Sequence, residues 1–294
     1  MHKSGFVNII GNPNVGKSTL MNALVGEKLS IITSKAQTTR HRILGIVNGD
    51  DFQIIFSDTP GILKPCYKLQ ESMMNFVRGA LSDADVLLYV TDTVERDDER
   101  AAEIIDRIRQ SGVPTLVVVN KIDLTTQEAL EALVEKWRAT LPDAEIIPIS
   151  AREGFNIAGL FDRILALLPE GEPFYPKDTL TDKTLRFFAS EIIREKILRF
   201  YDKEIPYCCE IEIESYKEEP AIDRIAATIY VARDSQKGIL IGHKGEKLKR
   251  VGQAAREDME QFLGKKVFLQ LFVKVNDDWR NNERQLRRFG YELE

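Results

Sequence analysis

The sequence is poor in cysteine and histidine, with three of each among 294 residues. Cys208 and Cys209 are adjacent on a strand-like run, and the three cysteines match neither a disulfide framework nor a metal-ligand spacing. We interpret them as buried reduced thiols. The histidines, His2, His41 and His243, also lack a metal-like spacing, so we assign them no catalytic role.

The chain also lacks long hydrophobic runs, repeats and low-complexity tracts. Its longest apolar runs, such as 86–90 and 164–168, fall far short of the roughly 18 residues that a membrane-spanning helix needs. The N-terminus enters a strand-like run at once, which leaves no room for a signal peptide. These absences argue against an integral membrane protein and predict a cytoplasmic one.

What is present indicates two globular domains, because domains average roughly 150 residues. The net charge of −5 arises in the first half, since from residue 171 onward 23 Lys and Arg balance 23 Asp and Glu. Within that neutral half, a basic stretch from Lys237 to Arg250 contains five cations against the single acid Glu246. Such a stretch produces a local positive field.

In the first half, short apolar runs alternate with segments of helical period. The runs, which are nearly continuous like parallel strands buried on both faces, are 6–10, 54–56, 86–90, 116–119 and 146–149. Crossover helices are predicted over 18–25, 72–81, 99–108, 129–137 and 157–168. Residues 43–48 and 52–57 are predicted to form an antiparallel edge hairpin. The pattern predicts a doubly wound, mostly parallel α/β sheet.

The second half has a different organisation. Proline and glycine concentrate in 169–180, which we predict to be a linker between a first domain, 1–168, and a second domain, 181–276. Behind the linker we expect helix, strand, strand, helix and strand over 183–201, 210–214, 225–232, 247–262 and 267–275. This order is typical of a small α+β domain. A basic and aromatic tail, 277–294, ends the chain.

The segment Gly11 to Ser18 matches G-x-x-x-x-G-K-S between a predicted strand and a predicted helix. Its glycines allow successive N–H groups to point inward, and the following helix adds its positive N-terminal end, so the loop is suited to a polyphosphate. Lys17 would reach the β- and γ-phosphates, and Ser18 would ligate Mg²⁺. The expected nucleotide contacts are Gly11, Asn12, Asn14, Val15, Gly16, Lys17, Ser18 and Thr19.

A D-x-x-G motif follows the second hairpin strand. Asp58 can hold Mg²⁺ through water, and the N–H of Gly61 can bind the γ-phosphate. The next residue is Ile62, at a position where a nucleotide-hydrolysing P-loop protein can carry a glutamine that orients water. Because an isoleucine can neither orient nor deprotonate water, we predict slow intrinsic hydrolysis that needs a partner or a bound cation.

Guanine specificity is predicted from two loops that follow buried strands. Asp123 can accept two hydrogen bonds from guanine, and adenine presents no such pair of donors. Asn120 would meet N7 and brace the phosphate loop, Lys121 would lay its stem over the ring, and the Ala151 N–H would meet O6. The base-site residues are Asn120, Lys121, Asp123, Ser150, Ala151 and Arg152.

A G-x-x-G loop, Gly242 to Gly245, precedes the basic helix of the second half. Backbone at such a loop can approach a sugar-phosphate chain closely, and the helix N-terminus and lysines attract phosphate. The candidate RNA contacts are Ile241, Gly242, His243, Lys244, Gly245, Lys247 and Arg250. The tail allows two interpretations, in which Trp279 and Phe289 either pack on the core or contact RNA by stacking and charge.

Together these motifs resemble those of the translation-factor-like GTPases, and closely those of the bacterial Era family, over essentially the full chain. The segment Lys35 to Arg42 resembles the effector loop of that family. The resemblance implies that Thr39 closes on Mg²⁺ and the γ-phosphate, with Thr38 as the competing assignment, and that Lys17, Thr39 and Gly61 are the catalytic groups. It also implies a GTP/GDP switch whose moving segments are 33–42 and 61–67. Asn14 implies K⁺ near the phosphates.

For the second half, the resemblance implies a type II KH domain with single-stranded RNA in a groove floored by 239–241. The implied target is the 3′ end of 16S ribosomal RNA, which would place the protein in assembly of the 30S subunit. A monomer is implied, and we add peripheral association with the inner face of the cell membrane as an expectation.

Two other function classes stay open on sequence alone. A metabolic P-loop enzyme such as a nucleotide kinase would need an acceptor site and lid arginines, which we do not find. A membrane-linked regulator would use the lysines of the second domain to bind protein or lipid headgroups. Salt-sensitive binding to a short single-stranded RNA would separate the leading interpretation from the regulator.

Overall fold

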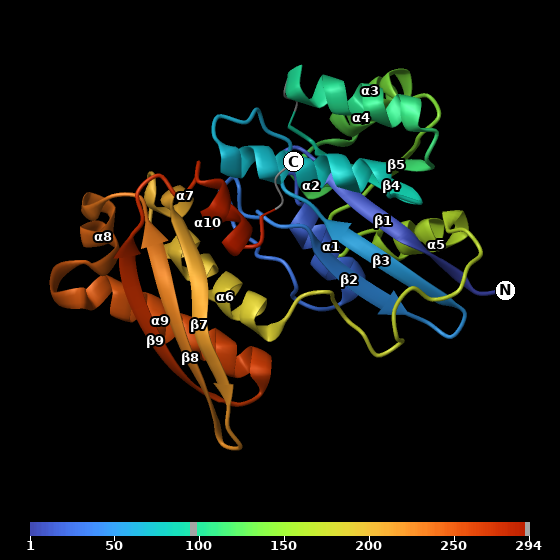
Figure 1. The fold of residues 1–294 in the computed structure, drawn as a ribbon. Helices are drawn as coiled ribbons and strands as arrows, with labels where there is room; N and C mark the ends of the chain where they lie inside the picture. Colours follow the sequence, from blue (N-terminus) through green and yellow to red (C-terminus); the bar gives the residue numbers. More distant parts are fainter. Residues whose placement is uncertain (95–98, 292–294) are drawn as a thin grey trace. The chain divides into compact units, whose positions relative to one another are not determined.

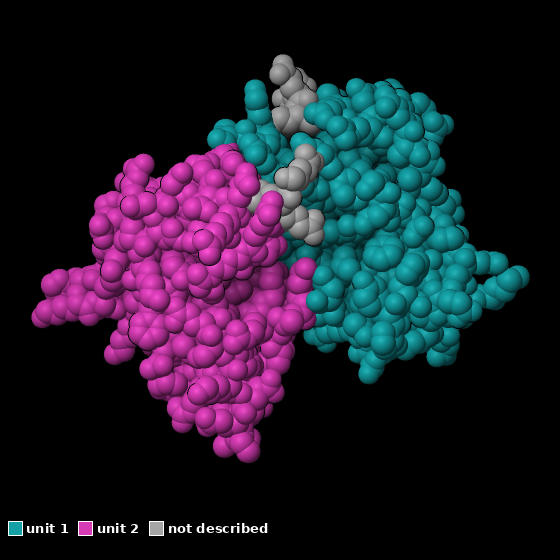
Figure 2. Space-filling model, in the orientation of Figure 1, with its two compact units in different colours: residues 1–66, 70–182, 294 teal, residues 67–69, 183–293 magenta. Residues whose placement is uncertain are grey.

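The computed structural model describes residues 1–94 and 99–291, which form two compact units (Figures 1 and 2). The first unit comprises residues 1–66 and 70–182 and the second comprises 67–69 and 183–291, in both cases as far as the structure describes them. The segment expected to be a linker, 169–180, therefore lies within the first unit. Over the described residues, the helices are too short or too polar for any of them to cross a membrane.

The first unit is built on a six-stranded sheet of order β2-β3-β1-β4-β5-β6. Its strands are β1 (Lys3–Gly11), β2 (Ile43–Asn48), β3 (Phe52–Asp58), β4 (Val86–Asp92), β5 (Thr115–Asn120) and β6 (Glu145–Pro148). β2 and β3 pair antiparallel and all other neighbours pair parallel, which confirms the predicted hairpin and the doubly wound sheet. Every residue of β5 is buried, as expected for a central parallel strand.

Helices cover both faces of this sheet (Figure 1). They are α1 (Lys17–Val25), α2 (Lys68–Ser82), α3 (Glu99–Ser111), η1 (Ile122–Leu124), α4 (Gln127–Thr140) and α5 (Ile157–Leu167). α2, α3 and α4 share one hydrophobic core with β1, β4 and β5, and α1 packs on β1, β2 and β3 beside α5. The loops after β1, β4, β5 and β6 therefore open at the same edge of the sheet, where ligand sites of such folds form.

The exit segment of the first unit, 169–182, pairs with the edge strand β2. The Ile46 N–H donates to the Leu180 carbonyl at 2.8 Å, and the Thr181 hydroxyl donates to the Leu44 carbonyl at 2.6 Å. The Leu44 N–H donates to a carboxylate oxygen of Asp182 at 3.0 Å. The segment thus covers a sheet edge that would otherwise expose unpaired backbone groups.

The second unit has a three-stranded sheet of order β7-β8-β9, and most of its helices share one hydrophobic core with one face of this sheet. β7 (Cys209–Glu218) and β8 (Ile222–Val231) pair antiparallel, and β8 and β9 (Lys266–Val275) pair parallel. The helices are α6 (Leu185–Phe200), α7 (Ile205–Cys208), α8 (Asp234–Ile241), η2 (His243–Gly245), α9 (Glu246–Leu263) and α10 (Glu283–Arg288). This arrangement confirms the α+β class.

The expected element order of the second unit was incomplete, because it lacked the short helix α7 before β7 and gave one helix between β8 and β9, where the structure has α8 and α9. The sequence DSQKGILI is only eight residues long and contains Gly238, so it shows no clear helical period. Ile239, Leu240 and Ile241 belong to this helix and point in different directions. Leu240 is buried and Ile239 is exposed, so the three do not together form the floor of a groove.

The C-terminal segment packs on the sheet of the second unit. Trp279 is fully buried, and its indole N–H donates to the Cys208 carbonyl at 3.1 Å. The Phe289 ring lies 5.9 Å from Trp279 and 5.5 Å from Tyr230, centroid to centroid. Of the two interpretations of the tail, packing on the core therefore holds for Trp279 and Phe289. Residues 292–294 lie outside the described residues.

Candidate functional site

The predicted phosphate loop connects β1 to α1, and its two glycines have backbone angles that other residues rarely adopt. Gly11 has φ +152° and Gly16 has φ +99°. A Cβ on Gly11 would lie 2.1 Å from the Val90 carbonyl oxygen, and one on Gly16 would lie 2.2 Å from Nδ2 of Asn120. Glycine is required at both positions because packing leaves no room for a side chain.

Lys17 is buried inside this loop. Its ammonium donates to the carbonyls of Gly11 at 3.0 Å and Asn12 at 2.9 Å. Burial lowers the pKa of Lys17 to about 8, against the opposing effect of the Asp58 charge. The hydrogen bonds of this buried ammonium go to neutral carbonyls, and the nearby Asp58 charge compensates it only in part, so the site favours an anion beside it.

Three oxygen-bearing side chains from three segments converge next to Lys17. The Ser18 hydroxyl donates to Asp58 Oδ2 at 2.7 Å and lies 2.9 Å from the Thr39 hydroxyl, which itself lies 3.3 Å from Asp58 Oδ2. Burial raises the pKa of Asp58, and the hydrogen bond from Ser18 and the charge of Lys17 oppose that rise. Asp58 Oδ1 is buried and has no hydrogen-bond partner among the described residues. Two hydroxyls and an unsatisfied carboxylate oxygen fit Mg²⁺, a cation that prefers oxygen ligands.

The two candidate threonines of the effector segment have different surroundings. Thr39 is buried beside Ser18 and Asp58. The Thr38 hydroxyl instead donates to the Lys35 carbonyl at 2.6 Å and lies 2.8 Å from the Thr33 hydroxyl. This geometry favours Thr39 over Thr38 as the residue that meets a cation.

The loop that begins with Gly61 lies against the phosphate loop. A Cβ on Gly61 would lie 2.9 Å from Pro13, and the Ile62 N–H donates to the Gly11 carbonyl at 3.2 Å. The Ile62 side chain is 1% exposed and belongs to the hydrophobic core. It therefore points away from the place where a hydrolytic water would need orientation.

The base-reading residues form a hydrogen-bonded set. Asn120 donates from Nδ2 to the Val15 carbonyl at 2.9 Å, which braces the phosphate loop as expected. Its Oδ1 accepts from the Ala151 N–H at 2.9 Å, so this N–H, expected to meet guanine O6, already has an acceptor. The exposed Asp123 carboxylate accepts from the Ser150 hydroxyl at 2.6 Å, with its remaining edge toward solvent.

Lys121 links the base-reading loop to the phosphate loop. Its ammonium donates to the Asn14 carbonyl at 2.5 Å and to Asp92 Oδ2 at 2.7 Å. Asp92 is a residue that our sequence analysis missed. It ends β4 at the same edge of the sheet as the other loops, and this position was the signal that could have identified it.

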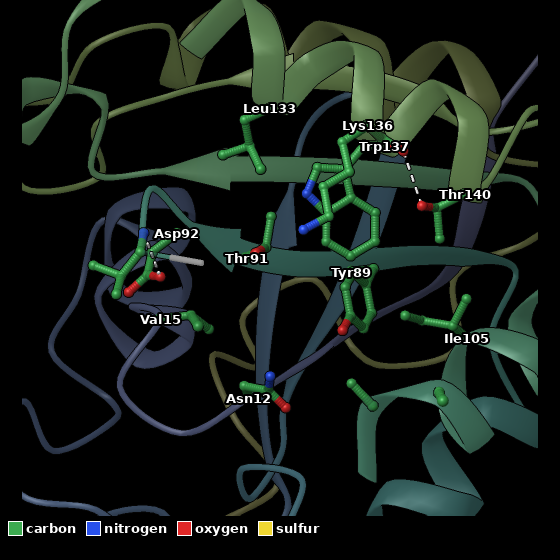
Figure 3. A pocket seen from close by; sticks show the side chains of 13 residues that line it. Asn12, Val15, Tyr89, Thr91, Asp92, Ile105, Leu133, Lys136, Trp137 and Thr140 are labelled. Carbon is green, nitrogen blue, oxygen red and sulfur yellow. Dashed lines mark hydrogen bonds between the residues drawn. The ribbon is translucent and has the colours of Figure 1, made fainter. Parts of the chain in front are cut away.

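A cavity of about 530 Å³ collects most of these residues. Its volume lies within the range of roughly 300–1,000 Å³ that is usual for ligand sites. Among the predicted site residues, its lining includes Asn14, Gly16, Lys17, Ser18, Thr19, Thr39, Gly61, Lys121 and Arg152. A smaller cavity of about 210 Å³ borders the same loop through Asn12 and Val15, and its lining includes Tyr89 and Trp137 (Figure 3).

The predicted RNA loop of the second unit lies between α8 and α9 and is open. Gly242, Lys244 and Gly245 have φ of +73°, +49° and +81°. A Cβ on Gly245 would have no atom within 4 Å in the part of the chain that the structure describes. The polar and basic side chains that we expect to contact RNA are exposed, namely His243, Lys244, Lys247 and Arg250. Ile241 is half-buried.

Comparison with known proteins gives matches over both units. The family model described as "50S ribosome-binding GTPase" matches residues 6–121, and the model described as "KH domain" matches residues 204–280. GTPase Era of Syntrophus aciditrophicus (strain SB) is 47% identical over 99% of this chain and 96% of its own length. GTPase Era of Staphylococcus haemolyticus (strain JCSC1435) is also 47% identical, over 99% of this chain and 97% of its own length.

Two solved structures agree with the whole fold. Era in complex with MgGDPNP and nucleotides 1506–1542 of 16S ribosomal RNA matches with a TM-score of 0.95, at 42% identity and full coverage of both chains. A single-residue variant of Aquifex aeolicus Era bound to GDP.AlF4⁻ matches with a TM-score of 0.94, at 43% identity, over 99% of this chain and all of the other. The P-loop G unit, the KH unit and the identity over nearly the full chain show that this protein belongs to the Era family of GTPases.

Proposed function

We propose that this GTPase is a switch that binds 16S ribosomal RNA near its 3′ end and acts in assembly of the 30S subunit. The main support for this proposal is that one chain contains both a closed phosphate loop and an open G-x-x-G loop. The Era structure that matches over its full length holds MgGDPNP together with nucleotides 1506–1542 of 16S ribosomal RNA. Cosedimentation with small ribosomal subunits, measured with a GTP analogue and with GDP, tests the proposal, and absence of binding in both states would contradict it.

In this proposal the phosphate site uses groups that are already arranged. The backbone N–H groups of residues 14–19 and the Lys17 ammonium would bind the phosphates. Ser18, Thr39 and Asp58 would hold Mg²⁺, which would supply positive charge beside the phosphates. Thr39 senses the γ-phosphate because it comes from the effector segment, and the N–H of Gly61 approaches the same phosphate from the opposite segment.

Hydrolysis by this site alone should be slow because Ile62 is part of the core and cannot orient the attacking water. We propose that K⁺ assists near Asn14, a residue that is exposed and has φ +64°. Turnover measured in K⁺ and in Na⁺ tests this step. Equal rates in the two salts would remove K⁺ from the mechanism.

Selection of guanine is proposed to depend on the exposed edge of Asp123. An amide at this position presents a donor where guanine also presents one, whereas xanthine offers a carbonyl acceptor. Asp123→Asn should therefore move the preference from guanine to xanthine nucleotides, with a loss of roughly 2–4 kcal/mol for GDP. Titration of the variant with GDP and XDP measures the change, and retained GDP selectivity would refute the assignment.

Two finer parts of the proposal concern assembly state and location. We propose a cytoplasmic monomer, which light scattering checks against the chain mass of 33.5 kDa. We also propose peripheral association with the inner face of the membrane. Flotation with anionic vesicles at low and high salt tests that association, and it fails if the protein stays in the dense fraction at low salt.

A further inference from the structure

We propose that Asp92 is a positioning residue for purine binding, because it holds Lys121 in the conformation that covers the base. The inference rests on the proposed function, in which the stem of Lys121 lies over the guanine ring. Asp92 does not touch the nucleotide in this scheme, and it acts only through Lys121.

The geometry of the pair is specific. Asp92 is the last residue of β4, and its side chain is 1% exposed, beside Val15 of the phosphate loop (Figure 3). Its Oδ2 lies 2.7 Å from the Lys121 ammonium, and its Oδ1 accepts from the Val94 N–H at 3.2 Å. The hydrogen bond from the Val94 N–H therefore fixes the orientation in which the Asp92 carboxylate contacts Lys121.

Lys121 has a second anchor on the other loop. Its ammonium also donates to the Asn14 carbonyl, at 2.5 Å, and its own backbone is left-handed with φ +63°. A lysine side chain has four rotatable bonds and loses considerable entropy when a ligand orders it. With its tip held between Asp92 and Asn14, the stem is ordered before a base arrives, so binding does not have to order it.

The pair has a simpler interpretation as a buried ion pair that only supports the fold. Removal of one partner from such a pair destabilises a protein whatever its function, because the other charge is left uncompensated. Both interpretations therefore predict lower stability for Asp92→Asn. They differ in the effect on nucleotide affinity and in its dependence on Lys121.

A double-mutant cycle on GDP affinity and GDP release rate tests the inference. The full-length wild type, Asp92→Asn, Lys121→Gln and the double variant are compared. We expect Asp92→Asn to weaken GDP binding roughly tenfold, because the released lysine stem must then be ordered by the ligand, and the loss should arise mainly through faster release. In the Lys121→Gln background the same change should have no further effect. Independent, multiplying effects or an unchanged affinity in Asp92→Asn would overturn the proposal.

The nature of the base separates an effect on the face of the purine from an effect on its edge, and the dependence on Lys121 in the double-mutant cycle separates both from a merely structural role. Stacking acts on the face of the purine, so Asp92→Asn should weaken GDP and IDP by the same factor. Asp123→Asn acts on the edge and should affect the two differently, because IDP lacks the exocyclic amine. If Lys121→Gln leaves GDP affinity unchanged, the stacking role of Lys121 fails and the inference fails with it, while guanine selection by Asp123 stands or falls separately.

The chain provides a matched control in the other unit. Asp223 pairs with Lys265 at 2.5 Å, and the side-chain exposures are 5% and 30%, against 1% and 30% for Asp92 and Lys121. Asp223→Asn should lower stability and leave GDP affinity unchanged. Asp92→Glu keeps the charge and covers the case in which Asp92→Asn does not fold. Its GDP affinity should lie below that of the wild type and above that of Lys121→Gln, and wild-type affinity together with wild-type release would contradict the proposal.

Discussion

The protein contains two glycine loops that precede helices, one in each unit, and they are built in opposite ways. In the first, packing leaves no room for a Cβ on Gly11 or Gly16, and the lysine of the loop is buried. In the second, Gly245 has open space around it and Lys244 is exposed. The same sequence device thus forms a closed site for a compact triphosphate and an open one for a long polymer.

The difference shows what determines the conformation of each loop. The phosphate loop is held by β4 and by Asn120, so its shape depends on the fold of the whole unit. The G-x-x-G loop depends mainly on its own backbone angles. Substitutions in the first loop should therefore affect stability and binding together, whereas at Gly245 the stability cost should be limited to the strain of its positive φ.

The largest effect is expected from Gly11→Ala. A Cβ only 2.1 Å from the Val90 carbonyl oxygen must displace backbone of β4, so the free energy of unfolding should fall by roughly 3–5 kcal/mol and nucleotide binding should be lost. Denaturant unfolding and GDP titration measure both. Gly154→Ala is the control, because φ is +70° there and no described atom lies within 4 Å. It should cost only about 1–2 kcal/mol.

A smaller and more selective effect is expected from Gly245→Asp. The new carboxylate would repel phosphate where the backbone must approach it, so affinity for a single-stranded RNA from the 16S 3′ end should fall about a hundredfold. GDP affinity should not change. Gly264→Asp places the same side chain at φ +64°, with no described atom within 4 Å, at the far end of α9. If this control weakens RNA binding equally, the loop is not the contact.

The smallest of the three effects is a pH dependence at the closed loop. The pKa of Lys17 is about 8 because the side chain is buried, and bound phosphates would raise it. Binding above pH 8 therefore takes up a proton, and GDP affinity should fall by up to about tenfold per pH unit there, and stay level below it. Titrations at pH 7, 8 and 9 measure this slope. Lys17→Arg, which stays charged, should remove the part of the slope that belongs to Lys17.

The same shift affects the stability of the protein without nucleotide. The folded-state pKa lies below the ordinary value of 10.5, so between about pH 8 and 10.5 the unfolded chain binds more protons than the native chain. The contribution of Lys17 to stability should therefore rise with pH in this window. A fall in the Lys17-dependent part of the unfolding free energy would contradict the burial of this side chain.

The sequence predicted well where local pattern and chemistry agree. Continuous apolar runs identified the parallel strands along the chain, and the motif residues identified the loops that meet at their ends. What it could not predict depends on packing between distant segments. Asp92 contacts Lys121 only because β4 and β5 are neighbours, and the burial of Trp279 depends on Cys208, far away in the chain. The helix α8 was missed because eight residues with a central glycine carry too little periodicity.

Pairing of residues 180–182 with β2 has a mechanical consequence. β2 begins at Ile43, four residues after Thr39, so it directly follows the effector segment. The same strand pairs with the residues by which the chain leaves the first unit. A displacement of the strand that preserves its three hydrogen bonds must carry the departing chain with it. Loss of those bonds would instead lengthen the free tether between the G unit and the KH unit.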